Sequence, residues 1–102
     1  MGADKRQFKR VPIVTQIDAQ AGGFPFIAVA ENISAGGMLI HTAKQIQEGQ
    51  VVHLKFTLPG GEDAILVDGI VQHTTPGSYL GIQFQNLDDA DRAAIEKLAE
   101  SA

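Results

Sequence analysis

Apolar and polar residues alternate along most of this chain, with the period of two that is typical of β-strands with one buried face. The clearest run covers residues 50–58, where every second residue after Gln50 is apolar: Val52, Leu54, Phe56 and Leu58. The residues between them are mostly polar. We expect the first set to face a core and the second set to face solvent.

Turn residues divide the alternating runs into short strands. Ala21-Gly22-Gly23 and Pro59-Gly60-Gly61 are both typical of tight turns, and the second predicts a hairpin. Six strands are predicted, over residues 11–18, 25–33, 37–42, 50–58, 63–73 and 78–85. A series of short strands joined by glycine turns indicates an antiparallel barrel or sandwich. We favour a six-stranded antiparallel β-barrel, because closure removes unpaired strand edges in a small domain.

The pattern changes near the C-terminus to the spacing of an amphipathic helix. Four apolar residues fall on one stripe, with charged residues outside it: Leu87, Ala94, Ile95 and Leu98. Acidic residues cluster at the start of this segment, where they stabilise the partial positive charge of a helix N-terminus. The sequence therefore predicts a mainly all-β fold with one C-terminal α-helix, over residues 88–100, packed on the barrel.

The charge of the chain is unevenly distributed. At 102 residues the chain has the size of one domain with a single core, and its net charge is −4. Four basic residues and one acidic residue give residues 1–10 a charge of +3, so residues 11–102 carry −7. An acidic body argues against DNA or RNA as a partner, because nucleic-acid binding needs a broad basic face. A small basic segment on an acidic body instead suits a compact anion.

Several classes of function lack the residues that they need. No apolar run approaches the roughly 20 residues of a membrane span, so we expect no membrane insertion. The absence of cysteine fits a cytoplasmic protein. His41, His53 and His73 lack the spacing of metal ligands, so we expect no metal and no other cofactor. Ser34 has no identified histidine and carboxylate partners, and we expect no enzymatic activity.

Two short motifs carry the candidate chemistry. Arg6 and Arg10 lie four residues apart, and an arginine can both bond an oxyanion through two donors and stack on a flat ring. Asn32 and Ser34 supply polar groups at a predicted strand end, and Gly37 permits the backbone to approach a ligand closely. These five residues predict a pocket for a small anionic nucleotide. The structural alternative for the second motif is a turn that side chains stabilise.

Arg-x-x-x-Arg followed by Asn-x-Ser-x-x-Gly, ahead of a series of short strands, resembles the PilZ domain family. Members of that family are bacterial receptors for cyclic di-GMP, built on a six-stranded barrel. The resemblance covers nearly the whole chain. It implies that Arg6 and Arg10 hold the guanines and phosphates of the ligand. It also implies that Asn32, Ser34 and Gly37 complete the pocket on the barrel surface.

Further residues near the two motifs are secondary candidates for ligand contact: Lys5, Lys9, Gly36 and His41. In the family, the position just before the first arginine is associated with whether one ligand or a stacked pair is bound. A cation at Lys5 favours a pair. Asn32 stands where the family allows either Asp or Asn, and it keeps an acceptor oxygen, so we expect binding to survive.

The resemblance also implies that two parts of the chain have different roles. Residues 1–10 are expected to form a flexible N-terminal segment, and residues 11–102 the barrel with its helix. Ligand would order the segment and create a surface that an effector protein of motility or exopolysaccharide regulation recognises. The main alternative is a protein-interaction module on the same fold that does not bind nucleotide. A small barrel that binds single-stranded nucleic acid is less favoured, because aromatic residues are few and the body is acidic.

Overall fold

The computed structural model describes residues 9–75 and 78–101. Within this part of the chain the backbone forms seven strands and one helix: β1 (Val11–Pro12), β2 (Gln16–Ala21), β3 (Phe24–Ser34), β4 (Gly37–His41), β5 (Val51–Phe56), β6 (Ile65–Thr75), β7 (Tyr79–Phe84) and α1 (Asp89–Ser101). A tight turn at Gly22 and Gly23 joins β2 to β3, and the connection between β5 and β6 contains a turn at Pro59 and Gly60, as the sequence indicated.

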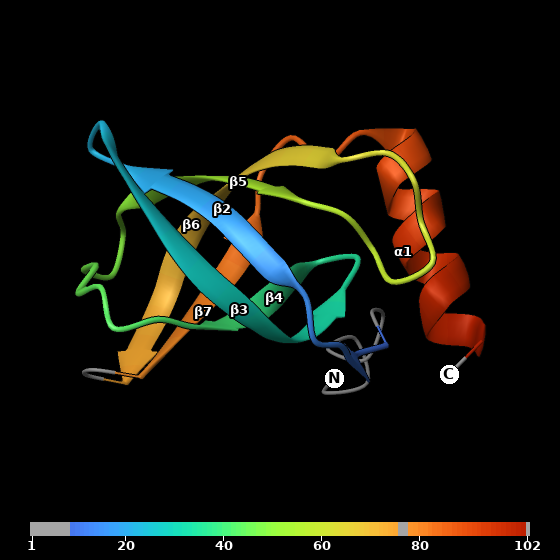
Figure 1. Ribbon diagram of the computed structural model, residues 1–102, viewed down its shortest axis with the longest axis horizontal. Coiled ribbons are helices and arrows are strands. Elements are labelled where there is room, and N and C mark those ends of the chain that lie inside the picture. Colours follow the sequence, from blue (N-terminus) through green and yellow to red (C-terminus); the bar gives the residue numbers. More distant parts are fainter. Residues whose placement is uncertain (1–8, 76–77, 102) are drawn as a thin grey trace, which may run out of the picture.

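Six of the strands close into an antiparallel barrel, with α1 standing at one end of it (Figure 1). The order around the barrel is β3-β2-β5-β6-β7-β4, and pairing between β3 and β4 closes the circuit. The short strand β1 lies outside this circuit and pairs with the end of β3. The predicted six-stranded antiparallel barrel with a C-terminal helix is confirmed, with β1 as an additional strand.

The prediction of one continuous strand over residues 11–18 was wrong. Pro12 lies opposite Asn32, and Gln16 lies opposite Val29. Three residues separate Pro12 from Gln16, but only two separate Val29 from Asn32, so the segment between β1 and β2 has one extra residue. An extra residue on one side interrupts the regular hydrogen-bond ladder and bends the strand. The result is two separate strands, β1 and β2, along the same edge of β3.

The barrel interior is filled by the apolar side chains that alternate with exposed residues along the strands. On β5, Val52, Leu54 and Phe56 are buried, while the residues between them are exposed, as the alternation predicted. The largest side chains that are fully buried come from five strands and the helix: Ile17, Ile33, Met38, Ile40, Val52, Val71 and Ile95. Burial of this apolar surface is the main term that stabilises the fold, at about 25 cal/mol per Å² removed from water.

The predicted helix is confirmed to within one residue at each end. Its first internal bond runs from the Arg92 N–H to the carbonyl oxygen of Asp88, at 2.8 Å. Ile95 and Ala99 are buried and Leu98 packs partly against the core, whereas Ala94, which the stripe included, is exposed. No helix in the described part of the chain is long and apolar enough to cross a membrane.

Candidate functional site

Strand pairing aligns residues from four strands in one row across the outer wall of the barrel. Asn32 of β3 lies opposite Leu39 of β4. Leu39 lies opposite Gly81 of β7, and Gly81 lies opposite His73 of β6. Three strand spacings separate the ends of this row, or about 14 Å. The barrel thus places the Asn32 motif on the same wall as residues from the second half of the chain.

A second row runs beside the first, toward the turn between β3 and β4. Ser34 lies opposite Gly37, and Gly37 lies opposite Gln83 of β7. The turn is held against β7, because the Phe84 N–H donates to the carbonyl oxygen of Gly36 at 2.9 Å. The second sequence motif is therefore one corner of the barrel wall.

Arg10 contacts this corner directly. Its Nη1 donates a hydrogen bond to Oδ1 of Asn32 at 2.7 Å, across 22 residues of sequence. The adjacent β1 pairs with the end of β3, and this pairing holds Arg10 beside Asn32. The contact is exposed, and a guanidinium has five N–H donors, so one bond to Asn32 leaves donors for a ligand. The described half of the arginine motif and the asparagine motif converge in space.

A shallow cavity of about 300 Å³ lies at this convergence. It is lined by Arg10, Ser34, Gly36, Gln72, His73, Gly81, Ile82 and Gln83. Arg10 supplies a permanent positive charge, and no carboxylate is among the lining residues. A lining that holds a cation and no carboxylate favours an anionic ligand.

The hydroxyl of Ser34 is used within the turn. Ser34 is only 2% exposed. Its Oγ accepts a hydrogen bond from the Gly36 N–H at 3.1 Å and lies 3.5 Å from the carbonyl oxygen of Gly37 as a donor. This is the side-chain-stabilised turn that was the structural alternative for the motif. A direct contact between Ser34 and ligand stays a prediction.

The backbone of β7 lies so close to position 37 that only glycine fits there. A Cβ at this position would overlap the carbonyl oxygen of Ile82 and would come within 3.3 Å of the Gln83 α-carbon. The close approach that the sequence attributed to a ligand is therefore made by a strand of the same protein. Its predicted role in ligand contact is untested.

The secondary candidates fall in different places. Gly36 lines the cavity, and Lys9 is exposed just before Arg10. His41 is at the opposite end of β4 from Gly37 and packs against Tyr79, with ring centroids 5.1 Å apart; it does not line the cavity. Lys5 and Arg6 lie outside the described residues.

Sequence reasoning missed the far side of the cavity. Gln72, His73, Gly81 and Gln83 line it, and the Gln72 amide donates to Oε1 of Gln83 at 2.8 Å. From the sequence, His73 was considered only as a metal ligand. Its position depends on the pairing of β6 with β7, which contains a register shift between Val71 and His73. The sequence contains no local signal for that shift.

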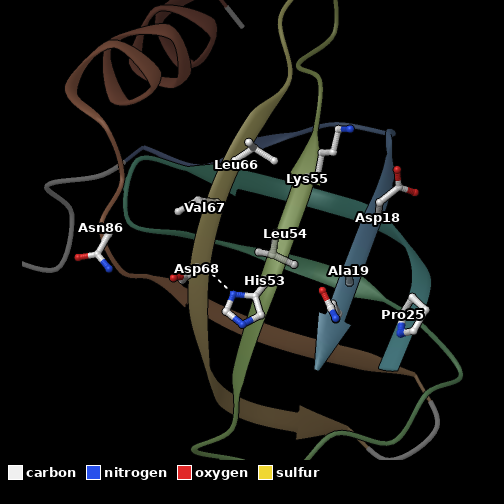
Figure 2. Close-up of a pocket in the computed structure, with 11 residues that line it drawn as sticks. Asp18, Ala19, Pro25, His53, Leu54, Lys55, Leu66, Val67, Asp68 and Asn86 are labelled. Carbon is white, nitrogen blue, oxygen red and sulfur yellow. Dashed lines mark hydrogen bonds and ion pairs between the residues drawn. The ribbon is translucent and has the colours of Figure 1, made fainter. Parts of the chain in front are cut away.

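A larger cavity, of about 460 Å³, lies on a different wall, over β2, β5 and β6 (Figure 2). Asp18 and Asp68 line it together with His53 and Lys55. Nδ1 of His53 lies 2.6 Å from Oδ1 of Asp68, so one carboxylate is already engaged. Two acidic side chains and one permanent cation make this groove a poorer site for an anion than the smaller cavity.

Potential metal ligands do not gather in the described parts of the chain. Between residues 9 and 75 and between 78 and 101, no three His, Cys, Asp or Glu side chains lie close enough to hold an ion together. The groups that line the smaller cavity are a guanidinium, amides, an imidazole, a hydroxyl and backbone groups, all of which can form hydrogen bonds to a ligand.

Comparison with protein families gives one match over nearly the whole chain. The family model described as the PilZ domain matches residues 4–101. A search of the curated proteins found no significant match.

Several solved structures share the fold. The inhibitor of motility MotI/DgrA from Bacillus subtilis has a TM-score of 0.83 at 22% identity, over 94% of this chain and 50% of that chain. The PilZ domain of YcgR from Escherichia coli, solved with c-di-GMP, has a TM-score of 0.75 at 16% identity, over 95% and 90% of the two chains. The MrkH–c-di-GMP complex from K. pneumonia has a TM-score of 0.70 at 19% identity, over 94% and 50%. This chain thus spans about half the length of MotI and of MrkH.

Proposed function

Because this chain belongs to the PilZ domain family, we propose that it is a receptor for cyclic di-GMP. The observation that carries the proposal is the 2.7 Å hydrogen bond between Arg10 and Asn32. It joins the two sequence motifs at the rim of a cavity that has no acidic lining residue. YcgR and MrkH, which share the fold, have been solved with c-di-GMP.

The side chains that line the cavity suit both the phosphates and the guanines of cyclic di-GMP. The guanidinium of Arg10 bonds a phosphate oxygen through its free donors or stacks on a guanine face. A hydrogen bond to a charged group contributes about 1.5–3 kcal/mol, and an arginine over an aromatic face about 0.5–2 kcal/mol. A few such contacts, less the cost of ordering side chains, correspond to a dissociation constant of about 1 μM or lower.

The signalling step is assigned to residues 1–10. This segment carries a charge of +3 next to a body of −7 and includes Arg6, the second arginine of the motif. A dianionic ligand on the barrel wall attracts it, and the ligand shifts the segment toward the closed position by its preference for that state. The closed segment and the barrel wall together form the surface that an effector protein of motility or exopolysaccharide regulation recognises.

Isothermal titration with cyclic di-GMP tests the receptor proposal. We expect Arg10→Ala to weaken affinity by about tenfold to a hundredfold, because it removes a charged hydrogen bond. Arg92→Ala, on the helix, is the matched control and should bind as the wild type does. Wild-type affinity in an Arg10→Ala, Ser34→Ala double variant would refute the site. If the wild-type protein bound no ligand, the protein-interaction module without nucleotide would replace the proposal.

Limited trypsin digestion tests the signalling step separately. Cleavage after Lys5, Arg6 and Arg10 should slow when cyclic di-GMP is added, because the closed segment no longer reaches the protease active site. Cleavage after Lys97, on α1, serves as the internal control and should be unchanged. Equal cleavage of residues 1–10 with and without bound ligand would leave the receptor but remove the order–disorder switch.

A further inference from the structure

The imidazole of His73 covers a glycine on the neighbouring strand. His73 of β6 lies directly opposite Gly81 of β7. A Cβ placed on Gly81 would overlap Cε1 of that ring, and would lie 2.8 and 2.9 Å from its two nitrogens. An approach in the ring plane would leave both nitrogens much farther away than Cε1. These distances therefore place one face of the imidazole on Gly81, with the ring parallel to the barrel wall.

The opposite face of the ring is available to a ligand. The side chain of His73 is exposed, and it lines the same cavity as Arg10. An aromatic ring that packs on a cross-strand glycine is held in one orientation, because the missing side chain leaves a seat for it. A flat ring that is fixed on a strand and open on one face is the arrangement on which proteins stack nucleic-acid bases.

The spacing of the two groups fits a ligand with two bases. Asn32, which binds Arg10, and His73 stand at opposite ends of the same cross-strand row, about 14 Å apart. Gly81 lies between these two backbone positions, and the His73 ring covers it, so the ring lies about two strand spacings, or about 10 Å, from Asn32. A cyclic dinucleotide with one base or phosphate at Arg10 carries a second purine on the far side of its ring, which reaches toward His73.

We propose that His73 is a stacking platform for one of the two guanines of cyclic di-GMP, opposite the base or phosphate that Arg10 holds. This assignment rests on the proposed function and names a residue outside both sequence motifs. The contribution comes from the aromatic face and not from a charge on the imidazole. A phenylalanine at this position therefore keeps it, and an alanine removes it.

Titration of four proteins with cyclic di-GMP tests the platform: the wild type, His73→Ala, His73→Phe and His53→Ala. We expect His73→Ala to weaken affinity by about fivefold to a hundredfold, the range measured for loss of one base–aromatic stack. We expect His73→Phe to stay within about threefold of the wild type. His53→Ala is the matched control, because His53 is also an exposed strand histidine but lines the larger groove on the other wall.

A spectroscopic measurement reports the stack directly. The chain contains no tryptophan, so His73→Trp introduces a single indole at the platform and His53→Trp a single indole away from it. Stacking on guanine should quench the fluorescence of the first variant on addition of cyclic di-GMP and leave the second unchanged. Circular dichroism of each variant shows whether the barrel is intact.

The outcomes separate this inference from the receptor proposal. If the wild type binds and Arg10→Ala does not, but His73→Ala binds normally, the platform is wrong and the receptor stands. Loss of affinity in both His73→Ala and His73→Phe would show that charge or hydrogen bonding, and not stacking, is used. Loss in His53→Ala alone would move the ligand to the larger groove, which would overturn the platform and the Arg10 site but leave the protein a receptor. A wild-type protein that binds no cyclic di-GMP would overturn both proposals.

Discussion

The α-carbon of Gly37 lies against the carbonyl oxygen of Ile82, on the strand next to it, so closely that a methyl group at position 37 would overlap that oxygen. The contact is between two backbones in a closed barrel, and neither can move aside without breaking the pairing of β4 with β7. The glycine of the second motif therefore serves the closure of the barrel before it serves any ligand.

Gly37→Ala should consequently destabilise the whole protein. We expect a loss of about 2–3 kcal/mol in the free energy of unfolding, because the overlap is with backbone and no side chain can rotate away. Urea denaturation followed by circular dichroism measures it. Gly60→Ala is the control: Gly60 has a φ of +80° but open space at its Cβ position, so only conformational strain of about 1 kcal/mol is expected. Equal losses in the two variants would contradict the packing argument.

Gly81→Ala should behave differently from Gly37→Ala. At Gly81 the added methyl meets the His73 imidazole, an exposed side chain that can rotate away. We expect a stability change of less than about 1 kcal/mol, since the substitution displaces one surface ring. If His73 is the platform, affinity for cyclic di-GMP should fall as it does in His73→Ala. Thermal denaturation and titration of the same sample measure the two effects. A large loss of stability would indicate that the ring cannot leave its place.

Ser34→Ala should lower stability more than its small size suggests. The Ser34 hydroxyl is buried and accepts the bond from the Gly36 N–H, so its removal leaves that donor without its partner in the turn. We expect a loss of about 1–2 kcal/mol by urea denaturation. Ser101→Ala is the control, because its hydroxyl bonds a helix carbonyl at the exposed end of α1. Similar values for the two variants would show that the turn does not depend on Ser34.

The Arg10–Asn32 contact should appear as coupling in ligand affinity. Asn32→Ala removes the acceptor that holds the guanidinium beside the cavity, so Arg10 must be ordered by the ligand itself. In a double-mutant cycle of Arg10→Ala and Asn32→Ala, we expect an interaction free energy of about 0.5–1 kcal/mol for cyclic di-GMP binding. Strictly additive effects would show that the two residues act independently, and that their hydrogen bond does not prepare the site.

Local sequence pattern was sufficient for the elements. The alternation of Val52, Leu54 and Phe56 predicted a buried face of β5, and the change of period after Leu87 predicted α1. These predictions succeed because the side-chain period of two or 3.6 is a property of each element by itself. The split of residues 11–18 into β1 and β2 was missed, because it depends on how many residues β3 uses between the same two pairings.

The site divides in the same way. The sequence by itself predicted that Arg10, Asn32 and Ser34 share one site, because two motifs at a fixed spacing resemble one family. It also determined the basic segment that precedes the acidic body. Only the tertiary structure decided that the Ser34 hydroxyl stabilises the turn and that Gly37 packs against the backbone of β7. The tertiary structure also decided that His73 lines the same cavity as Arg10. The reason is physical: a cross-strand row is fixed by registers between segments far apart in sequence, and a single bulge changes which side chain ends the row.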